Sequence, residues 1–87
     1  MLCVEYSIRG ENIHKEGNQF NNCYVGFIYM DASGNRQFCI NSYDGSFNWQ
    51  QDTLQMNTEE LGASSIQFLI FLSKSGTLWV DDVVFLD

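Results

Sequence analysis

The chain has 87 residues, of which 45% are hydrophobic and 15% aromatic, which suits one folded domain over residues 1–87 and excludes a disordered tail. Its 11 acidic residues outnumber 4 basic ones, and the formal net charge of −7 opposes the attraction that drives binding to nucleic acid or anionic membranes. The start of the sequence lacks the basic and apolar regions of a signal peptide, and no apolar run approaches a membrane span of about 20 residues. We therefore expect a soluble chain whose partners include neither nucleic acid nor membrane.

The first half of the chain shows strand patterns separated by polar turns. Residues 2–8 alternate apolar and polar side chains with the period of a half-buried strand, Gly10 interrupts them, and residues 14–19 indicate a loop. Residues 20–30 are apolar on both faces, which favours a central strand covered on two sides. Residues 31–35 (DASGN) predict a turn that leads into a strand over residues 36–41.

The second half continues in the same way. Asp44-Gly45 is a turn signal, residues 49–56 predict a strand, and residues 58–62 (TEELG) favour a turn over a helix. Residues 65–73 alternate, and the turn 74–76 (KSG) joins them to a closing strand over residues 77–86, predicting an antiparallel pair. About six strands, no proline and no extended helical period together predict an all-β protein, an antiparallel β-sandwich.

Three cysteines and a single histidine offer little chemistry. Cys3, Cys23 and Cys39 are widely spaced among apolar neighbours, so we expect buried thiols, with one disulfide as the alternative and no zinc site. An odd number of thiols favours a reducing compartment. His14 lies in a polar stretch, which indicates a solvated loop residue rather than a general base. No nucleophile and base are paired, so we expect no enzyme activity.

Four segments, in order along the chain, resemble those of the jelly-roll carbohydrate-binding modules that are appended to polysaccharide-degrading enzymes. They are residues 6–13 (YSIRGENI), 24–34 (YVGFIYMDASG), 45–49 (GSFNW) and 75–87 (SGTLWVDDVVFLD). The resemblance covers most of the chain and implies a jelly-roll sandwich, an extracellular location within a larger secreted protein, and a non-catalytic polysaccharide-binding function.

The sequence departs from these modules at its start, because they have strands before the segment that residues 6–13 resemble. A sandwich without those strands exposes unpaired edges and an apolar face, both of which favour association with another chain. We therefore expect a homo-oligomer, most simply a dimer. An assembly sandwich that self-associates and binds no sugar is the alternative function.

Sugar recognition uses flat aromatic faces together with polar side chains that bond the hydroxyl groups. The candidate platforms are Trp49, Tyr43 and Trp79, and the candidate polar contacts are Asn41, Gln51 and Arg9. Trp79 lies between two apolar residues, so packing in the core or in an interface is the competing interpretation. Tyr43 adjoins the turn at Asp44-Gly45, which predicts a loop position.

An acidic pair, Asp81-Asp82, interrupts the apolar closing strand, and burying two carboxylates without partners would be costly. The first interpretation is a β-bulge that turns one Asp to solvent while Val83 and Phe85 return to the core. The family resemblance implies the alternative, a structural calcium held by this pair. We expect no other cofactor.

Overall fold

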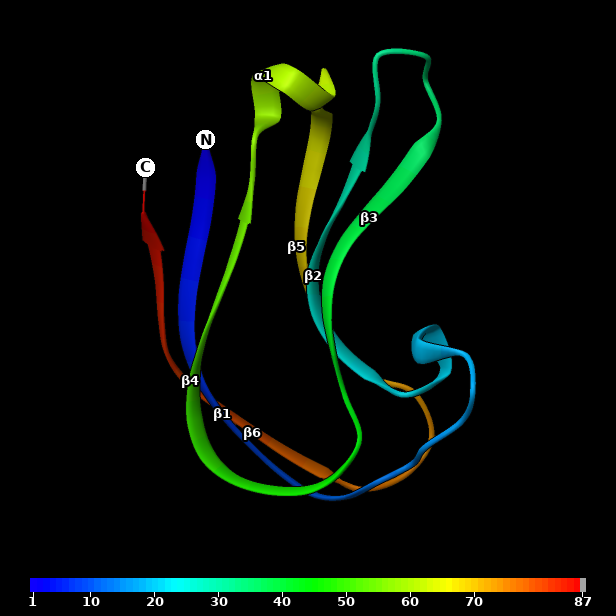
Figure 1. Ribbon diagram of the computed structural model, residues 1–87, viewed down its shortest axis with the longest axis vertical. Coiled ribbons are helices and arrows are strands. Elements are labelled where there is room, and N and C mark those ends of the chain that lie inside the picture. Colours follow the sequence, from blue (N-terminus) through cyan, green and yellow to red (C-terminus); the bar gives the residue numbers. More distant parts are fainter. Residues whose placement is uncertain (87) are drawn as a thin grey trace.

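The structure, a computed structural model, describes residues 1–86 and all of their side chains except that of Gln19. It is an all-β sandwich of two antiparallel three-stranded sheets that face each other (Figure 1), as the strand periodicity predicts. The strands are β1 (Leu2–Ile13), β2 (Cys23–Met30), β3 (Arg36–Tyr43), β4 (Gly45–Met56), β5 (Ser64–Leu72) and β6 (Thr77–Leu86). The first sheet has the order β4-β1-β6, and the second has the order β3-β2-β5.

The core lies between the central strands β1 and β2. Val4, Tyr6 and Ile8 alternate along β1 toward the second sheet and are fully buried, and Val25 and Phe27 meet them from β2. The side chains between them on β1 face outward, as the two-residue period of a strand requires. β2 is thus the central strand of its sheet, as expected for residues 20–30, but only its inner face is covered by a second layer, not both faces as expected.

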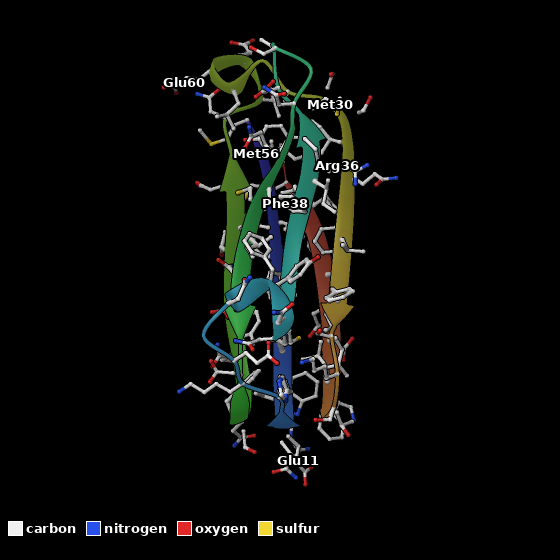
Figure 2. All side chains as sticks on the ribbon, turned by 90° about the vertical axis from the view of Figure 1, so that its right-hand side faces the viewer. Glu11, Met30, Arg36, Phe38, Met56 and Glu60 are labelled. Carbon is white, nitrogen blue, oxygen red and sulfur yellow. The ribbon has the colours of Figure 1, made fainter. Side chains whose placement is uncertain are left out.

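The outer face of the second sheet is also apolar, but few elements cover it. Phe20 lies in a short 3-10 helix (Gln19–Asn21), not in the strand expected over residues 20–30, and its ring meets Phe38 edge-on at 5.4 Å. Tyr24 stacks on Phe71 at 5.0 Å, with 7% of its surface exposed. Figure 2 views this side of the molecule, with Phe38 labelled near the start of β3.

Three further sequence expectations need correction. β1 does not end at Gly10 but runs on to Ile13, because Gly10 still pairs with Phe47 of β4 and Leu78 of β6. A Cβ at Gly10 would lie 2.5 Å from the Phe47 ring, so the strand needs glycine there. Residues 58–61 form a helical turn, α1 (Thr58–Leu61), rather than a simple turn, because Asn57 caps its start and Gly62 ends it at a φ of 60°.

The third correction concerns β5 and β6, which were expected to pair with each other. β5 pairs with β2 and β6 pairs with β1, so the connection at residues 73–76 crosses from one sheet to the other. Both are edge strands, and they lie along the same side of the sandwich, as the yellow and red strands show in Figure 2. We call this side the open edge, defined by β5 and β6.

Candidate functional site

The outer face of the first sheet brings together four of the six ligand-binding residues expected from the sequence. Arg9 faces outward from β1, where it pairs with Trp79 of β6. On the other side of β1, Ser7 pairs with Gln51 of β4. Trp49 lies on β4 close to Gln51. Because neighbouring strands are about 4.8 Å apart, the backbones at Trp49 and Trp79 are roughly 10 Å apart across β1.

A bulge in β4 presents Trp49. The pairing of β1 with β4 shifts between Ile8 and Gly10, so that Asn48 and Trp49 together lie opposite the single residue Arg9. Asn48 fixes this turn of the chain, since its Oδ1 accepts a hydrogen bond from the Trp49 backbone at 2.8 Å. The Trp49 side chain is 48% exposed, the higher value of the two tryptophans.

The Trp49 ring borders a cleft of about 350 Å³. The lining residues come from all three strands of the first sheet: Ser7, Trp49, Gln50, Gln51, Asp81 and Asp82. A second hollow, which Arg9, Glu11 and Asn48 help to line, lies one step further along β1 and β4. The cleft thus combines one exposed aromatic ring with amide, hydroxyl and carboxylate groups.

The acidic pair at one side of this cleft is a β-bulge. The pairing of β1 with β6 shifts between Glu5 and Ser7, and Asp82 has a φ of 51°, which a non-glycine residue adopts only rarely. The Asp82 backbone donates to Asp81 Oδ1 at 2.8 Å, and both carboxylates are exposed. The expected bulge is confirmed, although Val83 and Phe85 return only partly to the core, at 39% and 53% exposure.

Trp79 belongs to the surface rather than to the core. Its side chain is 36% exposed, and the guanidinium carbon of Arg9 lies 4.6 Å from the centre of its ring. This cation–π contact covers one face of Trp79 and holds the Arg9 side chain across the sheet surface. Trp79 therefore orients a hydrogen-bond donor, whereas Trp49 leaves about half of its surface exposed.

Tyr43 and Asn41 do not join the site on the first sheet. Tyr43 lies at the end of β3 and is 9% exposed, so its expected loop position is wrong. Both side chains point between the sheets, where Asn41 Nδ2 donates to Tyr6 Oη at 2.9 Å and Tyr43 Oη donates to Asp52 Oδ2 at 2.5 Å. Burial, together with the hydrogen bond to Asp52, raises the pKa of Tyr43. These hydrogen bonds connect β3 with β1 and β4, so in this structure Tyr43 and Asn41 stabilise the sandwich.

The residues considered for metal and thiol chemistry remain separate. Within residues 1–86, no three histidine, cysteine, aspartate or glutamate side chains gather as a metal site would require, so the acidic pair finds no third such ligand. The three cysteines are free thiols; Cys23 is buried, which raises its pKa to about 11, while Cys3 and Cys39 are partly exposed.

His14 lies near Glu16, with 3.0 Å between His14 Nε2 and Glu16 Oε1. Glu16 also pairs with Lys74. These two partners lower the pKa of Glu16 to about 2, the hydrogen bond from Lys74 contributing most. His14 is thus part of a contact between the loop after β1 and the turn before β6, not of the cleft.

Sequence reasoning missed Ser7 as a member of the site. Its position on the outward-facing half of β1 was readable from the alternation of residues 2–8, but its neighbours on β4 and β6 depend on the pairing of distant strands. The choice of Asp81 and Asp82 as candidate metal ligands did single out two of the residues that line the cleft.

Comparison with known proteins adds no name to this arrangement: no family model matches the chain, and neither curated proteins nor solved structures give a match. Among the described residues, no helix has the length and apolar character needed to cross a membrane.

Proposed function

We propose that the chain is a non-catalytic carbohydrate-binding module that holds a polysaccharide or oligosaccharide on the outer face of the first sheet. The observation that carries this proposal is the exposed ring of Trp49 at the border of a cleft lined by Ser7, Gln51 and Asp81. An aromatic face packs against the apolar C–H face of a pyranose, while amide, hydroxyl and carboxylate groups bond its hydroxyls. The segments that resemble jelly-roll carbohydrate-binding modules point to the same class of ligand.

Each polar side chain of the site offers a different kind of hydrogen bond to the sugar. Gln51 supplies an amide donor and acceptor, Ser7 a hydroxyl, and Asp81 a carboxylate acceptor, all in the cleft that Trp49 also lines. Arg9, held against Trp79, offers guanidinium donors to a second sugar unit across β1. Such a shallow site gives modest affinity, with Kd values from about millimolar to micromolar, or about −4 to −8 kcal/mol.

The charge of the site selects among glycans. Asp81 and Asp82 line the cleft, and the chain carries a net charge of −7. Carboxylates repel the uronate groups of an acidic polysaccharide, and this repulsion weakens as salt screens it. The ligand is therefore a neutral glycan. An extracellular location, as part of a larger secreted protein, accords with that ligand.

The test is a titration of the chain with neutral oligosaccharides, followed by calorimetry or tryptophan fluorescence. Trp49→Ala should weaken binding about tenfold or more, equal to about 1.4 kcal/mol, because it removes the stacking surface. Phe38→Ala is the matched control, since Phe38 is an aromatic residue with similar exposure, 41%, on the opposite sheet. Equal affinities for the two variants would contradict the site, as would tighter binding of a uronate polymer than of neutral glycans.

The module holds its ligand without cleaving it. Within the described residues, the cleft contains two carboxylates that are adjacent in sequence, not a pair facing each other across a substrate. We expect no release of reducing sugar from any bound glycan. Turnover that survives repurification and disappears in Asp81→Asn would refute this.

An assembly sandwich that binds no sugar is the second candidate, and the exposed apolar side chains of the open edge favour it. Under that alternative, no glycan would bind at all, while the chain would still self-associate.

A further inference from the structure

The open edge carries most of the exposed apolar surface of the molecule. Among the described residues, nine of the fourteen exposed large hydrophobic side chains lie in β5 and β6, four in β5 and five in β6. Monomeric proteins rarely expose apolar patches of this extent, and each edge strand also leaves backbone groups unpaired along its free side. The surface is therefore built to be covered.

Several of these side chains point between the two sheets, as core residues do, but remain exposed. Leu72 and Ile70 pair with Cys23 and Val25 of β2, which are fully buried, so they point between the sheets. They nevertheless remain 37% and 42% exposed. Phe68 and Phe85 meet across the two sheets at 5.2 Å, and Phe85 is 53% exposed. The layer between the sheets thus ends in solvent at this edge.

The opposite edge of the sandwich is bridged by hydrogen bonds, beside a hollow of about 510 Å³. Asn41 of β3 donates to the Tyr6 hydroxyl of β1 and to the Thr53 carbonyl of β4, and Tyr43 of β3 donates to Asp52 of β4. Among the described residues, β3 and β4 carry one exposed large hydrophobic side chain each, Phe38 and Trp49, compared with nine in β5 and β6, so the exposed apolar surface is concentrated at the open edge.

The two strands of the open edge differ in their readiness to pair. β6 carries Asp81 and Asp82 at a bulge in its middle, and charges and bulges are the devices that keep an edge strand from pairing. β5 carries no charged residue between Ser64 and Leu72. Its pairing with β2 is regular from Gln67 to Leu72.

We propose that two copies of this chain form a dimer in which β5 pairs with β5 of the second copy, antiparallel and about a two-fold axis. The second sheets of the two copies then join into one, and the exposed apolar side chains of β5 are covered together with those that β6 directs between the sheets. Val84 and Trp79 of β6 stay outside this interface, because they pair with the outward-facing Glu5 and Arg9. In a two-fold dimer the same surface of each copy contacts its counterpart, so this surface must be complementary to itself. An uncharged strand with apolar residues on both faces meets this requirement.

The area available suits a small dimer interface. Six exposed apolar side chains belong to β5 or point between the sheets from β6: Ile66, Ile70, Phe71, Leu72, Val83 and Phe85. Each leaves roughly 60 to 80 Å² in water, on the order of 400 Å² for one copy, and with the backbone of β5 this gives an interface at the small end of the known range. The cleft at Trp49 lies on the outer face of the first sheet, so the dimer and the sugar site are independent.

The test is sedimentation equilibrium of the full chain at micromolar concentration, with and without substitutions. The unmodified chain should have twice the monomer mass of 10.0 kDa. Ile70→Lys should weaken the dimer at least tenfold, because a lysine at an edge prevents strand pairing while its long side chain reaches water. Val84→Lys is the matched control on β6, where Val84 is 48% exposed, and should leave the dimer in place.

Salt and hydrogen exchange give readouts that do not depend on the variants. Each copy carries a net charge of −7, so raising salt to about 0.5 M should strengthen the dimer by screening repulsion. Amide protection in β5, but not in β6, should rise with protein concentration.

A folded monomer at every concentration would overturn the dimer. Dissociation by Val84→Lys as readily as by Ile70→Lys, or concentration-dependent protection confined to β6, would overturn the assignment to β5. Because neither readout involves sugar, failure here is distinct from failure of the carbohydrate site.

Discussion

Tyr43→Phe tests the polar network that closes the β3–β4 edge. Tyr43 Oη lies 2.5 Å from Asp52 Oδ2 and 2.6 Å from Tyr6 Oη. Each hydroxyl has one hydrogen to donate, and Tyr43 gives its hydrogen to Asp52. Tyr6 must then donate to Tyr43 and accept from Asn41, which lies at 2.9 Å. The hydrogen bonds therefore run in one direction, from Asn41 through both hydroxyls to the carboxylate.

This direction makes the two tyrosines unequal. Tyr43→Phe leaves the hydroxyl of Tyr6 without an acceptor at a site that is fully buried. An unsatisfied buried donor costs about 1–3 kcal/mol, and a lost bond to a carboxylate costs a similar amount. Asp52 retains the bond from Gln50 Nε2 at 2.8 Å, which reduces its share of the loss. We expect Tyr43→Phe to lower the free energy of unfolding by about 2–3 kcal/mol.

Tyr6→Phe should cost only about 1 kcal/mol, because every remaining donor keeps an acceptor. Asn41 Nδ2 still donates to the Thr53 carbonyl at 3.2 Å, and Tyr43 still donates to Asp52. The double variant should be more stable than the sum of the single losses predicts, since the orphaned Tyr6 hydroxyl no longer exists.

The assay is urea unfolding followed by tryptophan fluorescence, at one fixed protein concentration because self-association affects apparent stability. Tyr29→Phe serves as the control, since Tyr29 is 7% exposed and its hydroxyl makes no hydrogen bond to the described residues. A loss of 2–3 kcal/mol corresponds to a fall in Tm of roughly 10–20 °C for a domain of this size. The reasoning is refuted if Tyr43→Phe matches the control, or if Tyr6→Phe costs more than Tyr43→Phe.

Three further outcomes follow from groups outside this network. Cys23, with its pKa raised to about 11 by burial, should not react with Ellman's reagent at neutral pH until the protein unfolds; equal rates for all three thiols would contradict this. The depressed pKa of Glu16, about 2, means that its contribution to stability is complete above its ordinary pKa of 4.5 and is lost as the pH falls through about 2. Carboxyl NMR should show this titration, and Lys74→Ala should raise the pKa of Glu16; an unchanged pKa would show that the ion pair is not its cause. Chelation should leave Tm unchanged, because Asp81 and Asp82 are both exposed to solvent and Asp81 also accepts a backbone hydrogen bond. A drop of many degrees that calcium restores would contradict that account.

Local pattern was enough to predict the strands and the class of fold. The alternation of residues in β1 and the apolar residues of β2 indicate which side chains are buried. Gly34 and Gly45 indicate turns because glycine readily adopts a positive φ, which both residues have in the structure. The expectations were wrong where the local structure depends on residues that are distant in the sequence. Gly10 continues a strand because it pairs with Phe47 of β4 and Leu78 of β6, and both partners are distant in the sequence.

The site was recoverable only in part for the same reason. Trp49 stands beside polar residues and a turn, which is a local signal of exposure. No neighbouring residue indicates that Tyr43 is buried rather than exposed. Its hydroxyl bonds to Tyr6 of β1 and Asp52 of β4, which are distant in the sequence. Trp79 lies between apolar neighbours, yet it faces outward because strand alternation places Leu78 and Val80 toward the core.

The most direct test of the account is a map of backbone amide NMR shifts during titration with a neutral oligosaccharide. We predict that the shifts concentrate at Ser7, Trp49 and Gln51, with a separate change in the Trp49 indole signal, and that the second sheet is unaffected. Shifts centred instead on Phe38 and Tyr24 of the second sheet, or no shift with any neutral glycan at millimolar concentration, would contradict the carbohydrate site on the first sheet.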